Sequence, residues 1–332
     1  MGNYSKVSLL LVSILLFGIV GCETNNTATP EEIPEVTIEE TEEVESVDEE
    51  VLTENDEEIT DESKDLDSKF NSLLASERVS TELVNFIDEN ISDLKEEDAT
   101  NWIDKLEQKL DSDTEKRMNK IFELDTNNEL LEIDGASLYL SEEKIDLIKN
   151  DELKNEVQEN FNTFYKFVNV EGGFYPIVDY KKLSKYNEFI SEELSDYINI
   201  LSIDSEMKYF SDGGRVITIE DLKNRILETE TYLSNYSNGI REEKMTNEYE
   251  IKLRGYMAGL PNTPIYNFEN NKILTDIMDS FQETAALQNL ATGQILAKYI
   301  EDIENNDFII DEEILSKVDS YVAESVELIK NN

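Results

Sequence analysis

The sequence predicts an all-α fold: an irregular multi-helix domain with at most one or two short strands, preceded by a disordered acidic tether. Three observations support this. From residue 68 onward, apolar residues recur at helical spacing, and each apolar stripe has charged residues on its other side. Alternating strand patterns are scarce. Residues 31–67 carry 19 acidic side chains and one basic side chain, Lys64, with no glycine and no aromatic residue.

The helical part, residues 68–332, is long enough to bury a sizeable core. Its stripes predict about nine or ten helices, and a change of subdomain is possible near residue 238. Thr218 precedes one stripe with Asp221 three residues on, close to a capping box, and Asn238-Gly239 closes that helix. The best strand patterns are residues 137–140 and 174–178. Apolar stripes cover residues 99–121, 153–164, 183–201, 219–236 and 314–329.

The amino-terminal segment predicts export. Residues 7–20 carry no charge and follow Lys6. As a helix they would span roughly 21 Å, which is short of a hydrocarbon core of about 30 Å. The run ends in Ile19-Val20-Gly21-Cys22, which resembles the lipobox of bacterial lipoproteins. The resemblance implies a signal peptide at 1–21 and a diacylglyceryl thioether with acyl chains such as palmitate on Cys22. A plain signal peptide with an accidental cysteine is the alternative.

Residues 22–67 form the predicted lipidated cysteine and disordered linker. A stretch so rich in like charges buries too little apolar surface to offset its chain entropy, and its charges repel one another. We therefore expect a spacer that lifts the helical domain off the membrane.

Composition excludes several classes of function. The net charge of −47 opposes binding to nucleic acid or anionic lipid head groups. The chain has no histidine, and its one cysteine is Cys22, so histidine-based catalysis, thiolate metal sites and intrachain disulfides are excluded. Residues 125–136 begin like a calcium-binding loop, but Leu130 and Ala136 break the pattern. We expect no metal, no cofactor and no enzymatic activity.

Three loops interrupt the helical pattern, at residues 171–180, 211–215 and 259–267. If they meet in space, their aromatic and polar side chains would line a groove suited to a sugar or a peptide. The alternative is that their glycines and prolines only turn the chain between helices. The candidate binding residues are Tyr175, Asp179, Tyr180, Asp212, Arg215 and Tyr266.

Parts of these loops carry a second resemblance. The stretch 172–180, Asp221-Leu222 and residues 262–264 resemble an uncharacterised group of Gram-positive cell-surface helical domains. The similarity covers about residues 150–325. It implies an all-α fold at a Gram-positive surface, and it implies no activity or catalytic residue.

Together, the sequence predicts a membrane-anchored surface lipoprotein whose domain lies on the extracytoplasmic side. Its most favoured role is a non-enzymatic binding or scaffolding module that contacts a cell-wall polymer or an envelope protein, and no nucleic acid. One alternative is a ligand-capturing lipoprotein that feeds a transporter or receptor. Another is a carboxylate-based cell-wall hydrolase, which would need two carboxylates facing across a cleft.

Overall fold

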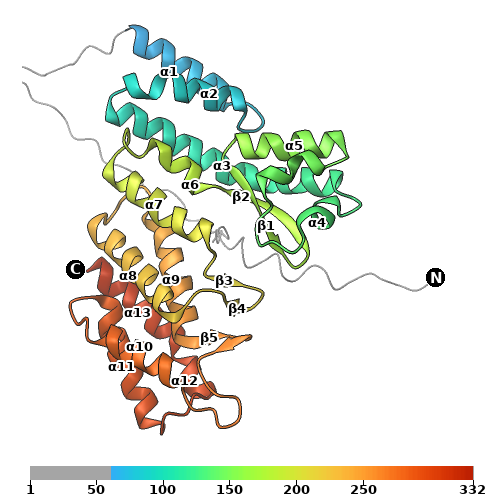
Figure 1. Cartoon of the computed structure of the whole chain (residues 1–332). Helices are drawn as coiled ribbons and strands as arrows, with labels where there is room; N and C mark the ends of the chain where they lie inside the picture. The colour runs from blue at the N-terminus through green and yellow to red at the C-terminus, as the bar shows by residue number, and fades with distance from the viewer. Residues whose placement is uncertain (1–60, 332) are drawn as a thin grey trace, which may run out of the picture. The chain divides into compact units, whose positions relative to one another are not determined.

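Helices account for most of the chain that the structure, a computed structural model, describes, namely residues 61–331 (Figure 1). The all-α class is therefore confirmed. The predicted signal peptide, Cys22 and residues 22–60 of the predicted linker lie outside the described residues. Among residues 61–331, no helix is both long and apolar enough to cross a membrane.

The first half of the described chain combines helices with one clear hairpin. Its elements in order are α1 (Asp61–Leu74), α2 (Thr81–Asn90), η2 (Ile91–Asp93), α3 (Glu96–Leu124), α4 (Glu129–Asp134), η3 (Glu142–Leu147), α5 (Asp151–Asn162), β1 (Tyr165–Val170), β2 (Gly173–Val178), α6 (Tyr180–Leu183), η4 (Ser184–Tyr186) and α7 (Glu192–Glu206).

The second half begins with a very short hairpin and contains six helices, with a second very short hairpin after the second of these helices. Its elements are β3 (Phe210–Ser211), β4 (Gly214–Arg215), α8 (Ile219–Asn235), α9 (Glu242–Ala258), β5 (Gly259–Leu260), β6 (Thr263–Pro264), α10 (Thr275–Ala285), α11 (Ala291–Asn305), α12 (Glu312–Ser316) and α13 (Val318–Lys330).

Helix α1 begins at Asp61, inside the segment assigned to the linker from sequence. The reason is tertiary: Phe70 is fully buried and stacks on Trp102 of α3, with ring centroids 4.5 Å apart. The indole Nε1 of Trp102 donates a hydrogen bond to Asp67 at 2.6 Å. These contacts fix residues 67–70 against α3, although the segment that precedes them is strongly acidic.

Two hydrophobic clusters hold the fold together. The larger runs from Phe70 in α1 to Ile329 in α13 and includes buried residues on both sides of residue 238, where α8 and α9 pack against each other. The smaller lies between the β1–β2 hairpin, α4 and α5, and it centres on Val157 and Phe167.

Helix ends follow the local signals closely but not fully. The Thr218 side chain accepts a hydrogen bond from the Asp221 N–H at 3.0 Å, as the capping pattern predicts. Helix α8 ends at Asn235, and Asn238 then takes a left-handed φ of 62°. The stripe that predicted helix over 153–164 runs too far, since α5 ends at Asn162. Phe164, at φ 64°, is instead a turn residue that is buried in the larger core.

Strands are more numerous than the one or two expected, because each predicted loop folds as an antiparallel hairpin. In the first two, an acidic residue and a glycine both have positive φ at the turn: Glu171 and Gly172, then Asp212 and Gly213. Two consecutive positive φ values match the right-handed twist of paired strands. The predicted strand at 137–140 contributes only a bridge, from Tyr139 to Val168 of β1.

Candidate binding surface

The first predicted loop is the β1–β2 hairpin and its exit. Asp179 is buried and caps α6 by accepting from the Lys182 N–H at 3.2 Å. Its carboxylate also lies 3.8 Å from the Lys166 ammonium. Tyr175 packs edge-on against Phe122 of α3, with ring centroids 5.1 Å apart. Both of these candidate binding residues are therefore engaged in contacts within the protein.

The third candidate, Tyr180, belongs to a buried network around Glu107 of α3. Glu107 is 2% exposed. Its carboxylate accepts hydrogen bonds from Tyr197 at 2.6 Å, Tyr180 at 2.7 Å, Arg241 at 2.9 Å and Lys244 at 3.0 Å. These donors come from α7, α6, the residue before α9, and α9. We call these five residues the Glu107 hub, and it joins the two halves of the domain.

Electrostatics keep the hub charged. Burial on its own would raise the pKa of Glu107, but Lys244, Arg241 and the two tyrosine hydroxyls outweigh it and hold the pKa below the ordinary value. Burial and the neighbouring carboxylate raise the pKa of Tyr197, so its hydroxyl stays protonated and donates. Three of the four donors bond to Oε1 and one, Arg241, bonds to Oε2, so both oxygens of the buried carboxylate are engaged inside the protein.

The second and third predicted loops meet. The Asn262 N–H donates to the Gly213 carbonyl oxygen at 2.8 Å, and the Arg215 N–H donates to the Thr263 hydroxyl at 2.8 Å. These bonds join the β3–β4 and β5–β6 hairpins into one surface element, which we call the joined hairpins. No hydrogen bond or ion pair among residues 61–331 links the first loop to them.

Within the joined hairpins the two charged candidates differ. Asp212 is exposed at the turn. Arg215 is partly covered, and its guanidinium donates to the Ile217 carbonyl oxygen at 2.6 Å. Burial lowers the pKa of Arg215 while Asp276 opposes that shift. Asp212 is thus available to a ligand, whereas Arg215 is partly used inside the protein.

Tyr266 lies two residues after the end of β6 and opens a tight turn. It pairs with Ile273 in an antiparallel bridge, and the Asn267 N–H donates to the Lys272 carbonyl oxygen at 2.9 Å. At the tip of this turn, Phe268 is 71% exposed, the most exposed large hydrophobic side chain of the described chain. Its ring meets Tyr266 in an edge-on contact at 5.7 Å.

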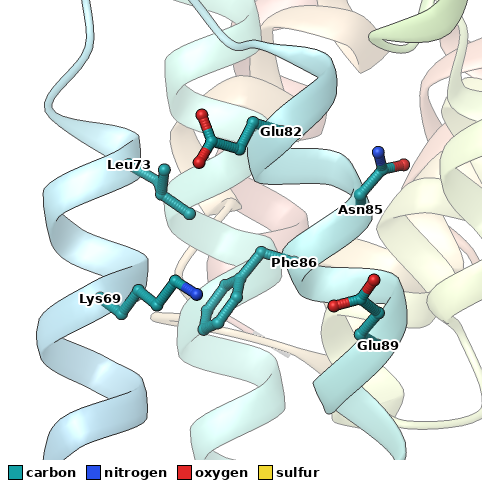
Figure 2. A pocket seen from close by; sticks show the side chains of 6 residues that line it. All are labelled: Lys69, Leu73, Glu82, Asn85, Phe86 and Glu89. Atoms are coloured by element: carbon teal, nitrogen blue, oxygen red, sulfur yellow. The ribbon is translucent and has the colours of Figure 1, made fainter.

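A separate groove lies between α1 and α2 (Figure 2). Its volume is about 370 Å³, and it is wide open to solvent. Lys69 lies over the ring of Phe86, 4.8 Å from its centroid. The groove is lined by Lys69, Leu73, Glu82, Asn85, Phe86 and Glu89.

Comparisons with known proteins give no assignment: no family model, no curated protein and no solved structure matches this chain. The resemblance to Gram-positive surface domains therefore stays a prediction. Within residues 61–331, no group of three or more acidic side chains is arranged to hold a metal ion.

Three features escaped sequence reasoning. Glu107 is one acidic residue among 76, and nothing local sets it apart. The groove between α1 and α2 depends on how the two helices pack against each other, and the sequence of either helix alone does not predict this packing. Phe268 did leave a signal, because it is a lone aromatic residue inside the polar run Asn267 to Asn271, where no apolar stripe needs it.

Proposed function

We propose that the chain is a membrane-anchored lipoprotein of the cell envelope and acts as a non-enzymatic binding module. The anchor is the lipid on Cys22, the spacer is the acidic segment that follows, and the ligand contacts the domain formed by residues 61–331. The proposal joins the lipobox pattern to the distribution of polar groups in the domain.

The observation that supports this proposal is the location of two kinds of polar group: those that are hydrogen-bonded within the protein and those that are not. Buried carboxylates are held by internal donors: Glu107 by four, and Glu230 by the Thr292 N–H at 3.2 Å, the Thr292 hydroxyl and the Ala291 N–H. Glu230 thereby caps α11, where a negative charge is favoured. Such carboxylates stabilise the fold. Among the candidate residues predicted from sequence, Asp212 on the joined hairpins is exposed and Tyr266 is only partly buried, so these remain open to a ligand.

The arrangement of the domain suits a tethered module. Figure 1 shows α1 and α2 at one end of the described chain and α11 and α12 at the other. The spacer would join at α1. The Tyr266 turn bonds to the loop between α11 and α12, since the Ile273 N–H donates to the Phe308 carbonyl oxygen at 3.0 Å. This turn is therefore at the end away from the attachment point.

The anchor is tested by replacing its cysteine. We expect Cys22→Ser to abolish incorporation of radiolabelled palmitate and to shift the chain from the membrane fraction to the medium. Asn25→Ser, three residues on, is the matched control and should stay with the membrane. A Cys22→Ser chain that remains lipid-labelled and membrane-bound would refute the anchor.

The binding role is tested with isolated cell envelopes. We expect the purified full chain to be retained on Gram-positive envelopes and released by excess unlabelled chain, without solubilising wall material. Steady release of wall fragments, lost on changing one or two acidic residues, would instead identify a hydrolase. Tight binding of a small molecule with no envelope retention would favour ligand capture, for which the groove in Figure 2 offers space.

A further inference from the structure

Two aromatic side chains stand out at the far end of the domain. Phe268 is 71% exposed and Phe308 is 42% exposed. Their segments are neighbours, because Ile273, which closes the Phe268 turn, donates its N–H to the Phe308 carbonyl oxygen. Lys272 and Ile309 form a second bridge between the same segments. We call the turns 266–273 and 306–309 the aromatic tip.

The aromatic tip is held rigidly although it is exposed. The Asn267 side-chain oxygen accepts from the Glu269 N–H at 2.8 Å, and that of Asn270 accepts from the Lys272 N–H at 3.0 Å. Phe308 adopts a left-handed φ of 61°, which is unusual for a bulky residue. The Asn306 side-chain amide donates to the Ile309 carbonyl oxygen at 2.8 Å and closes this second turn.

Rigidity matters because it lowers the entropic cost of binding. The turn that carries Phe268 is fixed by these hydrogen bonds, and its ring makes an edge-on contact with Tyr266 at an interplanar angle of 77°. Most of the Phe268 side chain is left in solvent. Exposing an apolar ring in this way gives no benefit to folding, so a partner that covers the ring would gain the energy of burying it.

The polar groups beside the ring define what could cover it. The side-chain NH₂ groups of Asn267 and Asn270 donate to no protein group within the described residues, and both residues are exposed. Glu269, next to Phe268, supplies acceptor oxygens. A flat aromatic face flanked by amide donors and a carboxylate matches a sugar ring, which offers C–H groups on one face and hydroxyls around its edge.

Charge narrows the class of glycan. With a net charge of −47, the protein repels polymers that carry phosphate or carboxylate groups. Glu269 and Asp307 add negative charge at the aromatic tip itself, and Lys272 offsets only one of them. The same repulsion opposes an anionic membrane. We therefore infer that the aromatic tip binds an uncharged glycan chain, with one sugar stacked on Phe268. This inference rests on the proposed binding function and specifies the chemical class of its ligand.

The test uses the full chain in a non-glycosidic detergent and insoluble chitin, an uncharged polymer of N-acetylglucosamine. We expect retention on chitin, competed by a soluble neutral hexasaccharide of N-acetylglucosamine. Phe268→Ala should weaken retention at least tenfold, because the stacking face is lost. Phe268→Tyr keeps the ring and should stay within threefold of the parent.

Phe122→Ala is the matched control. Phe122 is 44% exposed, on α3 in the other half of the domain, and its loss should change retention less than threefold. No retention on chitin, no competition by the hexasaccharide, or equal retention of Phe268→Ala and the parent would each overturn the inference. If isolated envelopes still retain the chain in those cases, the binding function stands with a different ligand or at a different site; if they do not, it fails as well.

Discussion

The Glu107 hub and the aromatic tip use polar and aromatic side chains in opposite ways. In the hub, a carboxylate 2% exposed has four internal donors, and its two tyrosines are buried. In the tip, Phe268 is 71% exposed and rests on one neighbour, Tyr266. The comparison teaches that residue type alone does not mark a binding site. The number of internal partners separates side chains that hold the fold from those left for a ligand.

The largest loss of stability is expected from changing the carboxylate of the Glu107 hub, and this change tests the comparison most directly. Glu107→Gln leaves Arg241 and Lys244 without their shared counter-charge in a buried setting, which we expect to cost about 3 kcal/mol of unfolding free energy. Urea unfolding measures it. Asp111 faces Lys244 at the surface, and Asp111→Asn should cost under about 1 kcal/mol. Equal effects of the two changes would mean that the hub is not a structural centre.

The same carboxylate predicts how stability depends on pH. The folded pKa of Glu107 lies below its ordinary value of 4.5, so its contribution is complete above that value and is lost as pH falls through the folded pKa. Between about pH 5 and about pH 3, we expect the parent chain to lose more unfolding free energy than Glu107→Gln does. Parallel losses in the two chains would place the acid sensitivity elsewhere.

A smaller effect is expected from removing one donor of the hub. Tyr197→Phe keeps the ring, which lies edge-on to Tyr180 at 6.0 Å, but removes a hydrogen bond to a charged group. We expect a loss of about 2 kcal/mol in urea unfolding. Tyr236→Phe is the control, because its hydroxyl bonds to Asp196 at the rim of the fold, and it should cost less than half as much.

The smallest effect should come from the aromatic tip. Phe268→Ala removes a ring that is mostly in solvent, so we expect the unfolding free energy to change by less than about 0.5 kcal/mol. Thermal and urea unfolding of this variant and the parent should superimpose. A loss of about 2 kcal/mol or more would show that Phe268 serves packing, and the contrast with the hub would disappear.

The sequence predicted the positions of the turns correctly, but it did not predict which of their side chains are exposed. It located all three Gly/Pro loops, because glycine and proline act on backbone angles within a few residues. It grouped Asp179 and Tyr180 with Asp212 as candidate ligand contacts. The structure buries the first two and leaves Asp212 exposed. Whether a side chain near such a turn points inward or outward depends on the residues that pack around it.

The sequence by itself determined the all-α class, the position of the Thr218 cap and the acidic character of the chain, since periodicity, local hydrogen bonds and net charge need no distant contact. The tertiary structure alone decided that Glu107 is a hub and that Phe268 shares its end of the domain with Phe308. The partners of Glu107 lie 73 to 137 residues away along the chain. Such partners are chosen by the packing of the whole core, which no local pattern encodes.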